Sequence, residues 1–134
     1  MAERLQLELV TPARRVLTEE VAEVRLPGIL GEMGVLPGHT PLLTALGTGP
    51  LAYTRDGAER RIAIQGGFAE VLPDRVTVLA TVAEFPEEID LAAARTALTE
   101  AESKLPSAAA EEIDALSDQV QLATTRIDVG GGAN

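Results

Sequence analysis

The fold of this chain is decided in residues 76–94, which read VTVLATVAEFPEEIDLAAA. From Val76 to Val82 every second side chain is apolar, a period that predicts β-strand. After Phe85-Pro86 alanine, leucine and carboxylates dominate, and apolar residues recur every three or four positions, as on one face of an α-helix. The sequence therefore predicts an α+β protein, with a β-rich domain at residues 1–86 and a helical domain at residues 87–134.

Short apolar alternation extends back from this segment to the first strand and is broken by turn residues. Asp56-Gly57 is a strong two-residue hairpin signal, and Pro73-Asp74 separates two further strands as a tight turn. Short antiparallel strands with turns at intervals of about ten residues predict a sandwich or a barrel. The Gly66-Gly67 pair weakens strand propensity, so we expect a bend or a close approach between sheets there. The alternating residues are Leu5, Leu7 and Leu9; Ala22, Val24 and Leu26; Ile62 and Ile64; and Val76, Val78, Ala80 and Val82.

The helical domain carries two apolar stripes with the spacing of a coiled-coil seam. The stripes consist of Leu91, Ala94, Leu98, Ala101 and Leu105, then of Ile113, Leu116, Val120, Ala123 and Ile127. Pro106 ends the first helix and Ser107 suits the N-cap of the second, so the helices are predicted to form an antiparallel hairpin. Because an alanine-rich seam buries little apolar area, the hairpin is expected to detach or rearrange. The glycine-rich tail from about residue 129 is predicted to be disordered.

Residues 31–43, GEMGVLPGHTPLL, form the most constrained stretch of the chain. Its glycines allow backbone angles that other residues avoid and its prolines fix φ, so the segment is predicted to be a shaped connection. It also holds His39, the only histidine in the sequence. Because shaped loops on rigid scaffolds commonly bind partners, this loop is a candidate contact surface.

The composition excludes several classes of function. A net charge of −10 repels nucleic-acid phosphates and anionic lipid headgroups, and three aromatic residues make no platform for stacking bases. Without cysteine there is no thiolate metal site, and one histidine cannot build a histidine-rich one. No apolar run approaches the roughly 20 residues that span a bilayer, and we expect no signal or transit peptide. We therefore expect a protein partner, no nucleic acid, no bound metal and no direct membrane insertion.

The sequence contains no group of residues that predicts catalysis. His39 has no serine or carboxylate partner in a recognisable nucleophile motif. Glu87, Glu88 and Asp90 cluster at a helix start, where carboxylates suit the helix dipole, so capping is preferred over metal binding. The glycine-rich segments match neither the P-loop nor the dinucleotide fingerprint. The residues alone indicate a two-part binding or coupling protein that is not an enzyme.

Three segments, together with the chain length and the alanine-rich hairpin, resemble the epsilon subunit of the bacterial F-type ATP synthase. The segments are Gly31–Leu43, Gly66–Val71 and Val76–Ala80. The resemblance implies an N-terminal antiparallel β-sandwich followed by a C-terminal antiparallel two-helix hairpin. It also implies a non-catalytic rotor subunit of the central stalk, in which the sandwich couples the proton-driven c-ring to the gamma subunit. The implied location is peripheral, on the cytoplasmic side of a bacterial plasma membrane.

Carried over residue by residue, the resemblance places the loop with Glu32 at the c-ring and places Gly38 and His39 at gamma, with residues 21–26 as a brace. The implied partner contacts are Glu32, Met33, Gly34, Gly38 and His39. The hairpin is implied to regulate ATP hydrolysis. Folded against the sandwich it is permissive, and extended along gamma into the alpha/beta catalytic hexamer it inhibits.

The hairpin departs from the family pattern at a nucleotide motif. Family members that bind ATP there carry Ile/Leu-Asp-x-x-Arg-Ala, whereas this chain reads Ile89-Asp90 and then has Ala93 at the arginine position. Arg95 lies about 200° around the helix from that position, so it cannot substitute unless the helix rotates. With Arg126 as the only arginine of the second helix, the ATP candidates are Ile89, Asp90 and Arg126. We expect weak or no ATP binding and no cofactor.

Charge is the second departure. Residues 87–134 carry ten carboxylates against three basic side chains, a net charge of −7. Repulsion from an acidic segment of the beta subunit would then oppose the extended state, which predicts weak inhibition. A free-standing β-sandwich adaptor, whose acidic hairpin docks on a basic partner, is the alternative function. Co-purification with gamma and a c-ring distinguishes the two.

Overall fold

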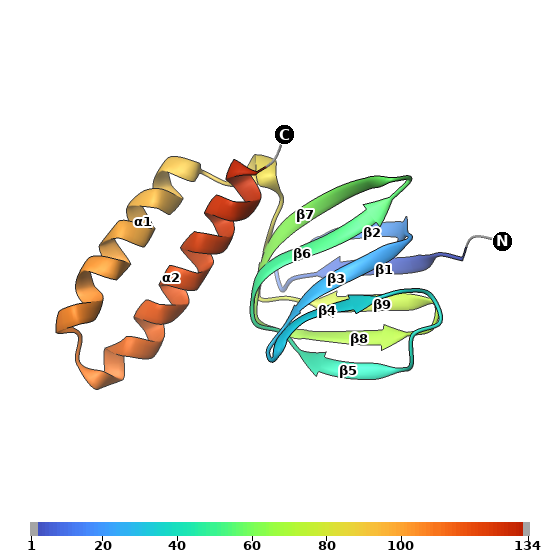
Figure 1. Cartoon of the computed structure of the whole chain (residues 1–134), viewed down its shortest axis with the longest axis horizontal. Helices are drawn as coiled ribbons and strands as arrows, with labels where there is room; N and C mark the ends of the chain where they lie inside the picture. The colour runs from blue at the N-terminus through green and yellow to red at the C-terminus, as the bar shows by residue number, and fades with distance from the viewer. Residues whose placement is uncertain (1–2, 133–134) are drawn as a thin grey trace.

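The structure, a computed structural model, describes residues 3–132 of the chain. In these residues ten strands form two five-stranded sheets that pack face to face, and a two-helix hairpin lies at one side of this sandwich (Figure 1). Paired strands are antiparallel except for β1 and β9, which are parallel. The predicted α+β class, an antiparallel β-sandwich followed by a two-helix hairpin, is confirmed.

Each of the two sheets takes strands from throughout residues 5–84. Sheet A contains, in spatial order, β2 (Arg15–Val21), β1 (Leu5–Val10), β9 (Arg75–Leu79), β8 (Phe68–Leu72) and β5 (Leu42–Ala45). Sheet B contains, again in spatial order, β10 (Val82–Glu84), β7 (Ala58–Gln65), β6 (Thr48–Arg55), β3 (Glu23–Gly28) and β4 (Gly31–Val35).

The core lies between the sheets and consists of the inward-facing half of each strand's alternation. The predicted turns set this register. Asp56 and Gly57 join β6 to β7 with φ of 51° and 81°, and Pro73-Asp74 joins β8 to β9. Fully buried core members include Leu5, Leu7, Leu9, Val24, Leu26, Ile62, Ile64, Val76 and Val78.

The alternation fails at two predicted positions. Ala22 is exposed because it lies in the bend between β2 and β3, and Val21 is buried instead. The run from Val76 is not one strand, since β9 ends at Leu79 in sheet A and β10 begins at Val82 in sheet B. The crossing between the sheets shifts the alternation by one residue, so that Ala83 rather than Val82 belongs to the core.

Gly66 and Gly67 carry the chain from β7 in sheet B to β8 in sheet A. Both have positive φ, 66° and 101°, which favours glycine. A Cβ atom on Gly67 would lie only 1.8 Å from the carbonyl oxygen of Leu79. The predicted bend is therefore confirmed, and with it a close approach of two backbone segments.

The helical part begins directly after β10. It consists of a 3₁₀ turn η1 (Pro86–Glu88), α1 (Leu91–Lys104), a second 3₁₀ turn η2 (Leu105–Ser107) and α2 (Ala110–Gly131). Figure 1 shows that α2 lies beside the sandwich and that α1 lies on the far side of α2. Of the two helices, α2 packs on β6 and β7 of sheet B, while α1 packs on α2. The buried seam between the helices includes the predicted residues Ala94, Ala101, Leu116 and Ala123.

The predicted N-cap of the second helix is wrong. Ser107 belongs to η2 and makes no side-chain capping bond, because that turn inserts further residues before α2 begins. Ala109 occupies the N-cap position instead. Its N–H donates a hydrogen bond of 3.0 Å to the Glu112 carboxylate. Because alanine has no side-chain oxygen, the N-cap residue itself cannot accept an N–H of the first turn.

The predicted disorder of the tail from about residue 129 is also wrong for residues 129–131. Val129 is buried, and α2 continues to Gly131. Gly130 makes this possible, since a Cβ atom there would lie 3.0 Å from Cγ2 of Ile89. The glycine allows the end of the helix to lie close against the segment that precedes α1. The last two residues of the predicted tail, 133 and 134, lie outside the described part of the chain.

Candidate partner-binding surface

The turn between β3 and β4 presents bulky apolar side chains to solvent. Leu30 is 100% exposed and Ile29 is 65% exposed, although turns of this kind usually carry small polar residues. The turn is held rigidly, because the Ile29 N–H donates to the Ala45 carbonyl at 3.1 Å and the Gly47 N–H donates to the Pro27 carbonyl at 2.8 Å. A fixed apolar tip of this kind is typical of a surface that a partner covers.

Glu32, Met33 and Gly34 follow this tip along β4, an edge strand of sheet B. Glu32 and Gly34 are exposed, whereas Met33 is half-buried and packs against the core. A Cβ atom on Gly34 would meet only a Glu23 carboxylate oxygen at 3.9 Å, so the surface beside this glycine is open. Two of the three predicted contacts therefore face solvent together, and the third supports the strand from beneath.

Gly38 and His39 lie in the connection between β4 and β5. Gly38 has φ of 86°, and its N–H donates to the Pro73 carbonyl at 2.7 Å, which ties the loop to the turn between β8 and β9. The His39 N–H donates to the Leu36 carbonyl at 3.2 Å, and its Nδ1 lies 2.6 Å from the Thr40 carbonyl oxygen. Backbone groups of the loop thus fix the half-buried imidazole in place.

The structure does not bring Glu32 and His39 into one site. Glu32 is near the start of β4, and His39 follows its end. A strand of five residues spans about 17 Å, so Glu32 and His39 lie toward opposite ends of one edge strand, with Gly34 between them.

The sequence interpretation missed an apolar patch on the outer face of sheet A. Phe68 and Leu79 are directly paired across β8 and β9, and they are 57% and 54% exposed. Leu43 on the adjacent strand β5 is 71% exposed and shares their face, since its partner in β8 is Glu70. We call Leu43, Phe68 and Leu79 the outer apolar patch. The sequence signal for this patch was the presence of apolar residues on both faces of a strand, a pattern that also occurs in strands buried on both sides.

The three ATP candidates are each engaged within the chain. Asp90 caps α1, its carboxylate accepting the Ala93 N–H at 3.0 Å. Arg126 forms a two-pronged ion pair with Glu84 of β10, at 2.7 and 2.9 Å. Ile89 packs against Gly130. A groove of about 160 Å³ between the helices is lined by Arg126 but by neither Ile89 nor Asp90.

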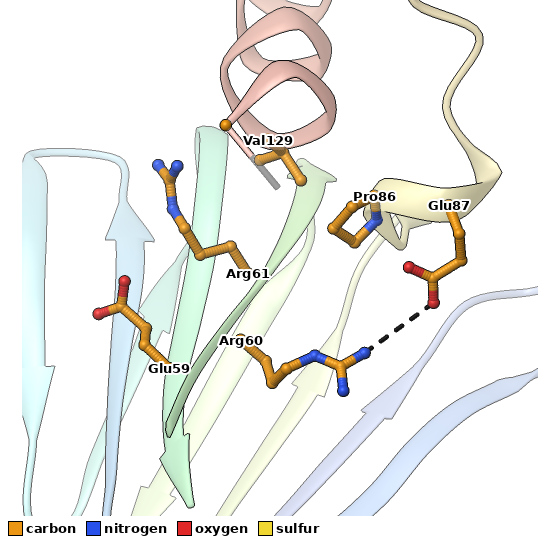
Figure 2. Close-up of a pocket in the computed structure, with 7 residues that line it drawn as sticks. Glu59, Arg60, Arg61, Pro86, Glu87 and Val129 are labelled. Atoms are coloured by element: carbon orange, nitrogen blue, oxygen red, sulfur yellow. Dashed lines mark ion pairs between the residues drawn. The ribbon is translucent and has the colours of Figure 1, made fainter. Parts of the chain in front are cut away.

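A second cleft, of about 380 Å³, lies where the sandwich meets the hairpin (Figure 2). Its lining residues are Glu59, Arg60, Arg61, Pro86, Glu87, Val129 and Gly132. Arg60 lies 3.9 Å from Glu87, as the dashed line in Figure 2 marks, and Arg61 pairs with Asp128 of α2 at 2.8 Å. The hydrogen bond with Asp128 raises the pKa of the Arg61 guanidinium further above its ordinary value. Carboxylates of the hairpin therefore neutralise both arginines.

Residues 3–132 present neither a metal-binding cluster nor a helix suited to cross a membrane. No group of three or more histidine, aspartate or glutamate side chains gathers in a way that could hold a metal ion in this part of the chain. Neither helix of the described chain combines the length and the apolar composition that a membrane crossing requires.

Comparison with known proteins identifies the family. Residues 4–86 match the family model described as ATP synthase, Delta/Epsilon chain, beta-sandwich domain. The chain is 52% identical over 112 residues to an ATP synthase epsilon chain of Geotalea uraniireducens, covering 84% of this chain and 81% of the relative. It is 47% identical over 133 residues to ATP synthase epsilon chain 2 of Syntrophotalea carbinolica, covering 98% and 96%.

A solved structure shares the fold at lower identity. It is a chain of the Euglena gracilis mitochondrial ATP synthase, from a complex described as OSCP/F1/c-ring in rotational state 1. The match has a TM-score of 0.82 and 29% sequence identity, and it covers 91% of this chain and 78% of the other. Over nearly its whole length, sandwich and hairpin together, the chain belongs to the ATP synthase epsilon chain family.

Proposed function

We propose that this chain is the non-catalytic rotor subunit that couples the c-ring to the gamma subunit of a proton-translocating F-type ATP synthase. The observation that carries the proposal is the arrangement along β4, where two exposed contact groups lie at opposite ends of one strand on a rigid sandwich. A coupling that joins two partners needs two surfaces in a fixed relation. The membership of the chain in the epsilon family supports the same role.

The ring-facing group is the β3–β4 tip with Glu32. Leu30 and Ile29 would supply apolar anchors, and Glu32 a charge that specifies register. Backbone hydrogen bonds to Ala45 and from Gly47 hold the tip to the sandwich, so force applied to the tip reaches the sheets without bending the turn.

The shaft-facing group is the loop with Gly38 and His39, extended by the outer apolar patch. The loop leads directly into β5, whose Leu43 belongs to the patch. Exposed apolar side chains that are paired across neighbouring strands are suited to a long-lived interface with gamma.

The hairpin is the proposed regulatory element. In the structure it is folded against sheet B, the arrangement that we assign to the permissive state. In an extended state it would reach the alpha/beta hexamer. The complex would place the chain peripherally at a bacterial plasma membrane, on its cytoplasmic side, in keeping with the bacterial relatives.

Site-directed crosslinking tests the coupling role. Because this chain has no native cysteine, an introduced cysteine is the only thiol on it that the reagent can label. Leu30→Cys and His39→Cys would be introduced singly into the assembled complex and treated with a short bifunctional reagent. We expect position 30 to crosslink to a c subunit and position 39 to gamma, with Thr18→Cys, on the exposed face of β2, as the control. Crosslinking of both positions to one subunit would contradict the proposal.

The adaptor alternative makes a different prediction in the same preparation. An adaptor would not co-purify with gamma and the c-ring from detergent extracts, and it would bind a basic partner through its acidic hairpin. The exposed carboxylates of residues 87–134 are the only feature that favours it. Recovery of the chain in a complex with gamma and c subunits would exclude this function.

A further inference from the structure

The hairpin is attached to the sandwich by the last turns of α2. Arg126 and Asp128 lie about 200° apart around the helix, so they flank its docked side. Thr125 and Val129 lie between them on that side and are both buried. Arg126 pairs with Glu84 of β10, and Asp128 pairs with Arg61 of β7. We call these two ion pairs the clasp.

The pair between Arg126 and Glu84 has the geometry of a strong contact. Nε and Nη2 of the arginine donate to the two carboxylate oxygens at 2.7 and 2.9 Å, and the side chains are 32% and 27% exposed. Two parallel charge-assisted hydrogen bonds fix both distance and orientation. This contact crosses from the hairpin to the last strand of the sandwich.

The pair between Arg61 and Asp128 adds a second interaction. Arg61 donates to both oxygens of Asp128, at 3.3 and 2.8 Å. It also lies at the C-terminal end of α2, whose last turn contains no basic residue of its own. A cation from β7 therefore meets the negative end of the helix dipole.

The apolar contact under the clasp is small. On the outer face of sheet B, Ala52 is paired with Arg61 and Ala63 is paired with Glu84, so both alanines share the face that α2 covers. Both are buried. Alanine, threonine and valine permit close approach but bury little apolar area, so the two ion pairs are the directional contacts on the docked side of α2.

We propose that the clasp makes docking of the hairpin sensitive to ionic strength while the sandwich is not. The clasp side chains are partly exposed, and salt screens such pairs, since the Debye length falls from about 10 Å at 0.1 M to about 3 Å at 1 M. The sandwich core is apolar and is not weakened in this way. Release of the hairpin is thus controlled at Arg126 and Asp128, at the end of the chain remote from the hairpin turn. The effect of hairpin release on the assembled complex rests on the proposed regulatory function, whereas the salt sensitivity of docking does not.

Energy transfer between two dyes on the isolated full-length chain tests the proposal. The dyes are placed on Ser107→Cys, at the hairpin turn, and Thr18→Cys, on sheet A, both exposed. We expect transfer to fall as sodium chloride rises from 0.1 to 1 M while sandwich unfolding in urea stays unchanged. Arg126→Glu and Glu84→Arg should each lower the docked-to-undocked ratio about tenfold at low salt, equivalent to about 1.4 kcal/mol.

Two variants separate an ionic clasp from lost packing. The double variant Arg126→Glu/Glu84→Arg restores the pair with its charges reversed and should recover transfer. Arg55→Gln removes an ion pair to Glu19 that lies wholly within the sandwich, and it should leave transfer unchanged. Transfer that is insensitive to salt, or no recovery in the double variant, would overturn the proposal. Because the isolated chain is used, neither result depends on the coupling function.

Discussion

At the scale of single residues, Gly67 illustrates how one backbone position is restricted to one amino acid. Its φ is positive, and a Cβ atom would lie 1.8 Å from the Leu79 carbonyl oxygen and 2.9 Å from the Ala80 Cα. Real Cβ atoms do not approach backbone so closely. Relief would require β8 and β9 to separate at the point where the chain changes sheets.

We therefore expect Gly67→Ala to destabilise the sandwich by more than about 3 kcal/mol or to prevent folding. Urea unfolding followed by circular dichroism measures the effect. Gly34→Ala is the matched control, because its Cβ would have no neighbour nearer than 3.9 Å, and it should change stability little. Equal stability of the two variants would show that the β7–β8 crossing is more pliable than the structure indicates.

Glu88 joins the start of the hairpin to the N-terminal strands. Its carboxylate accepts the Phe85 N–H at 2.9 Å and pairs with the Arg14 guanidinium at 2.8 Å. These contacts favour the charged form, the backbone hydrogen bond most, and lower the pKa of Glu88 below its ordinary value. A carboxylate with a lowered folded-state pKa stabilises the fold above its unfolded-state pKa, and this contribution is lost as pH falls through the folded-state pKa.

Glu88→Gln should therefore lower stability at neutral pH, and the difference from the wild-type chain should vanish in acid, below the usual glutamate range of about pH 4.3. Unfolding curves measured from pH 7 down to pH 3 give this difference directly. Glu102→Gln, at an exposed position of α1, serves as the comparison. A difference that stayed constant over the whole pH range would rule out titration of Glu88 as its cause.

At the scale of elements, α2 begins without the side-chain cap that most helices use. Ala109 occupies the N-cap with extended backbone angles, φ of −70° and ψ of 155°, which suit a capping serine. Ala109→Ser should stabilise the hairpin by about 1 kcal/mol, because the hydroxyl can accept an N–H of the first turn. Thermal unfolding monitored by helical circular dichroism measures the gain. Ser107→Ala should have no effect, and a loss on that change would mean that Ser107 does act as a cap.

The strand periodicity predicted elements better than it predicted their ends. Leu5, Leu7 and Leu9 alternate in the sequence and are buried in the structure, because one face of β1 meets the core. The run from Val76 to Val82 looked like one strand, because apolar residues continue through the point where the chain passes from sheet A to sheet B, and the sequence pattern does not reveal that change. The separate β9 and β10 are fixed by pairing with distant strands, which a local pattern does not contain.

The docking face of α2 could not be predicted from the same pattern. Ala52 and Ala63 occupy outward positions of β6 and β7, where small residues are uninformative about burial. They are buried because α2 covers them. The predicted contacts Glu32, Met33, Gly34, Gly38 and His39 came from the resemblance rather than from periodicity, and they stay predictions, with the crosslinking experiment as their test.

At the scale of the whole molecule, the charge of the hairpin bears on ATP. The candidate site lacks the family arginine at Ala93, and Arg126 is already paired with Glu84. A nucleotide would have to break that pair and enter a region of net negative charge. We expect isothermal titration calorimetry to show weak binding or none. Micromolar affinity would contradict this prediction, and Arg126→Gln would then show whether Arg126 is a ligand.

The same charge predicts weak inhibition of ATP hydrolysis by the hairpin. Removal of residues 87–134 from the assembled complex should raise hydrolysis only slightly, because a domain with a net charge of −7 is poorly attracted to an acidic partner. Hydrolysis rates of matched complexes, with assembly checked on native gels, provide the measurement. A many-fold rise would show that the hairpin inhibits strongly despite its charge.

The parallel pairing of β1 with β9 governs when the protein can fold during synthesis. Gln6 is aligned with Arg75 and Val10 with Leu79, so β1 acquires one of its two neighbours only after about 70 further residues have been made. The β3–β4 and β6–β7 hairpins, joined through the pairing of β3 with β6, can form earlier from nearer partners. A nascent chain stalled before residue 75 would leave one edge of β1 without its partner strand, an edge that can pair with another chain.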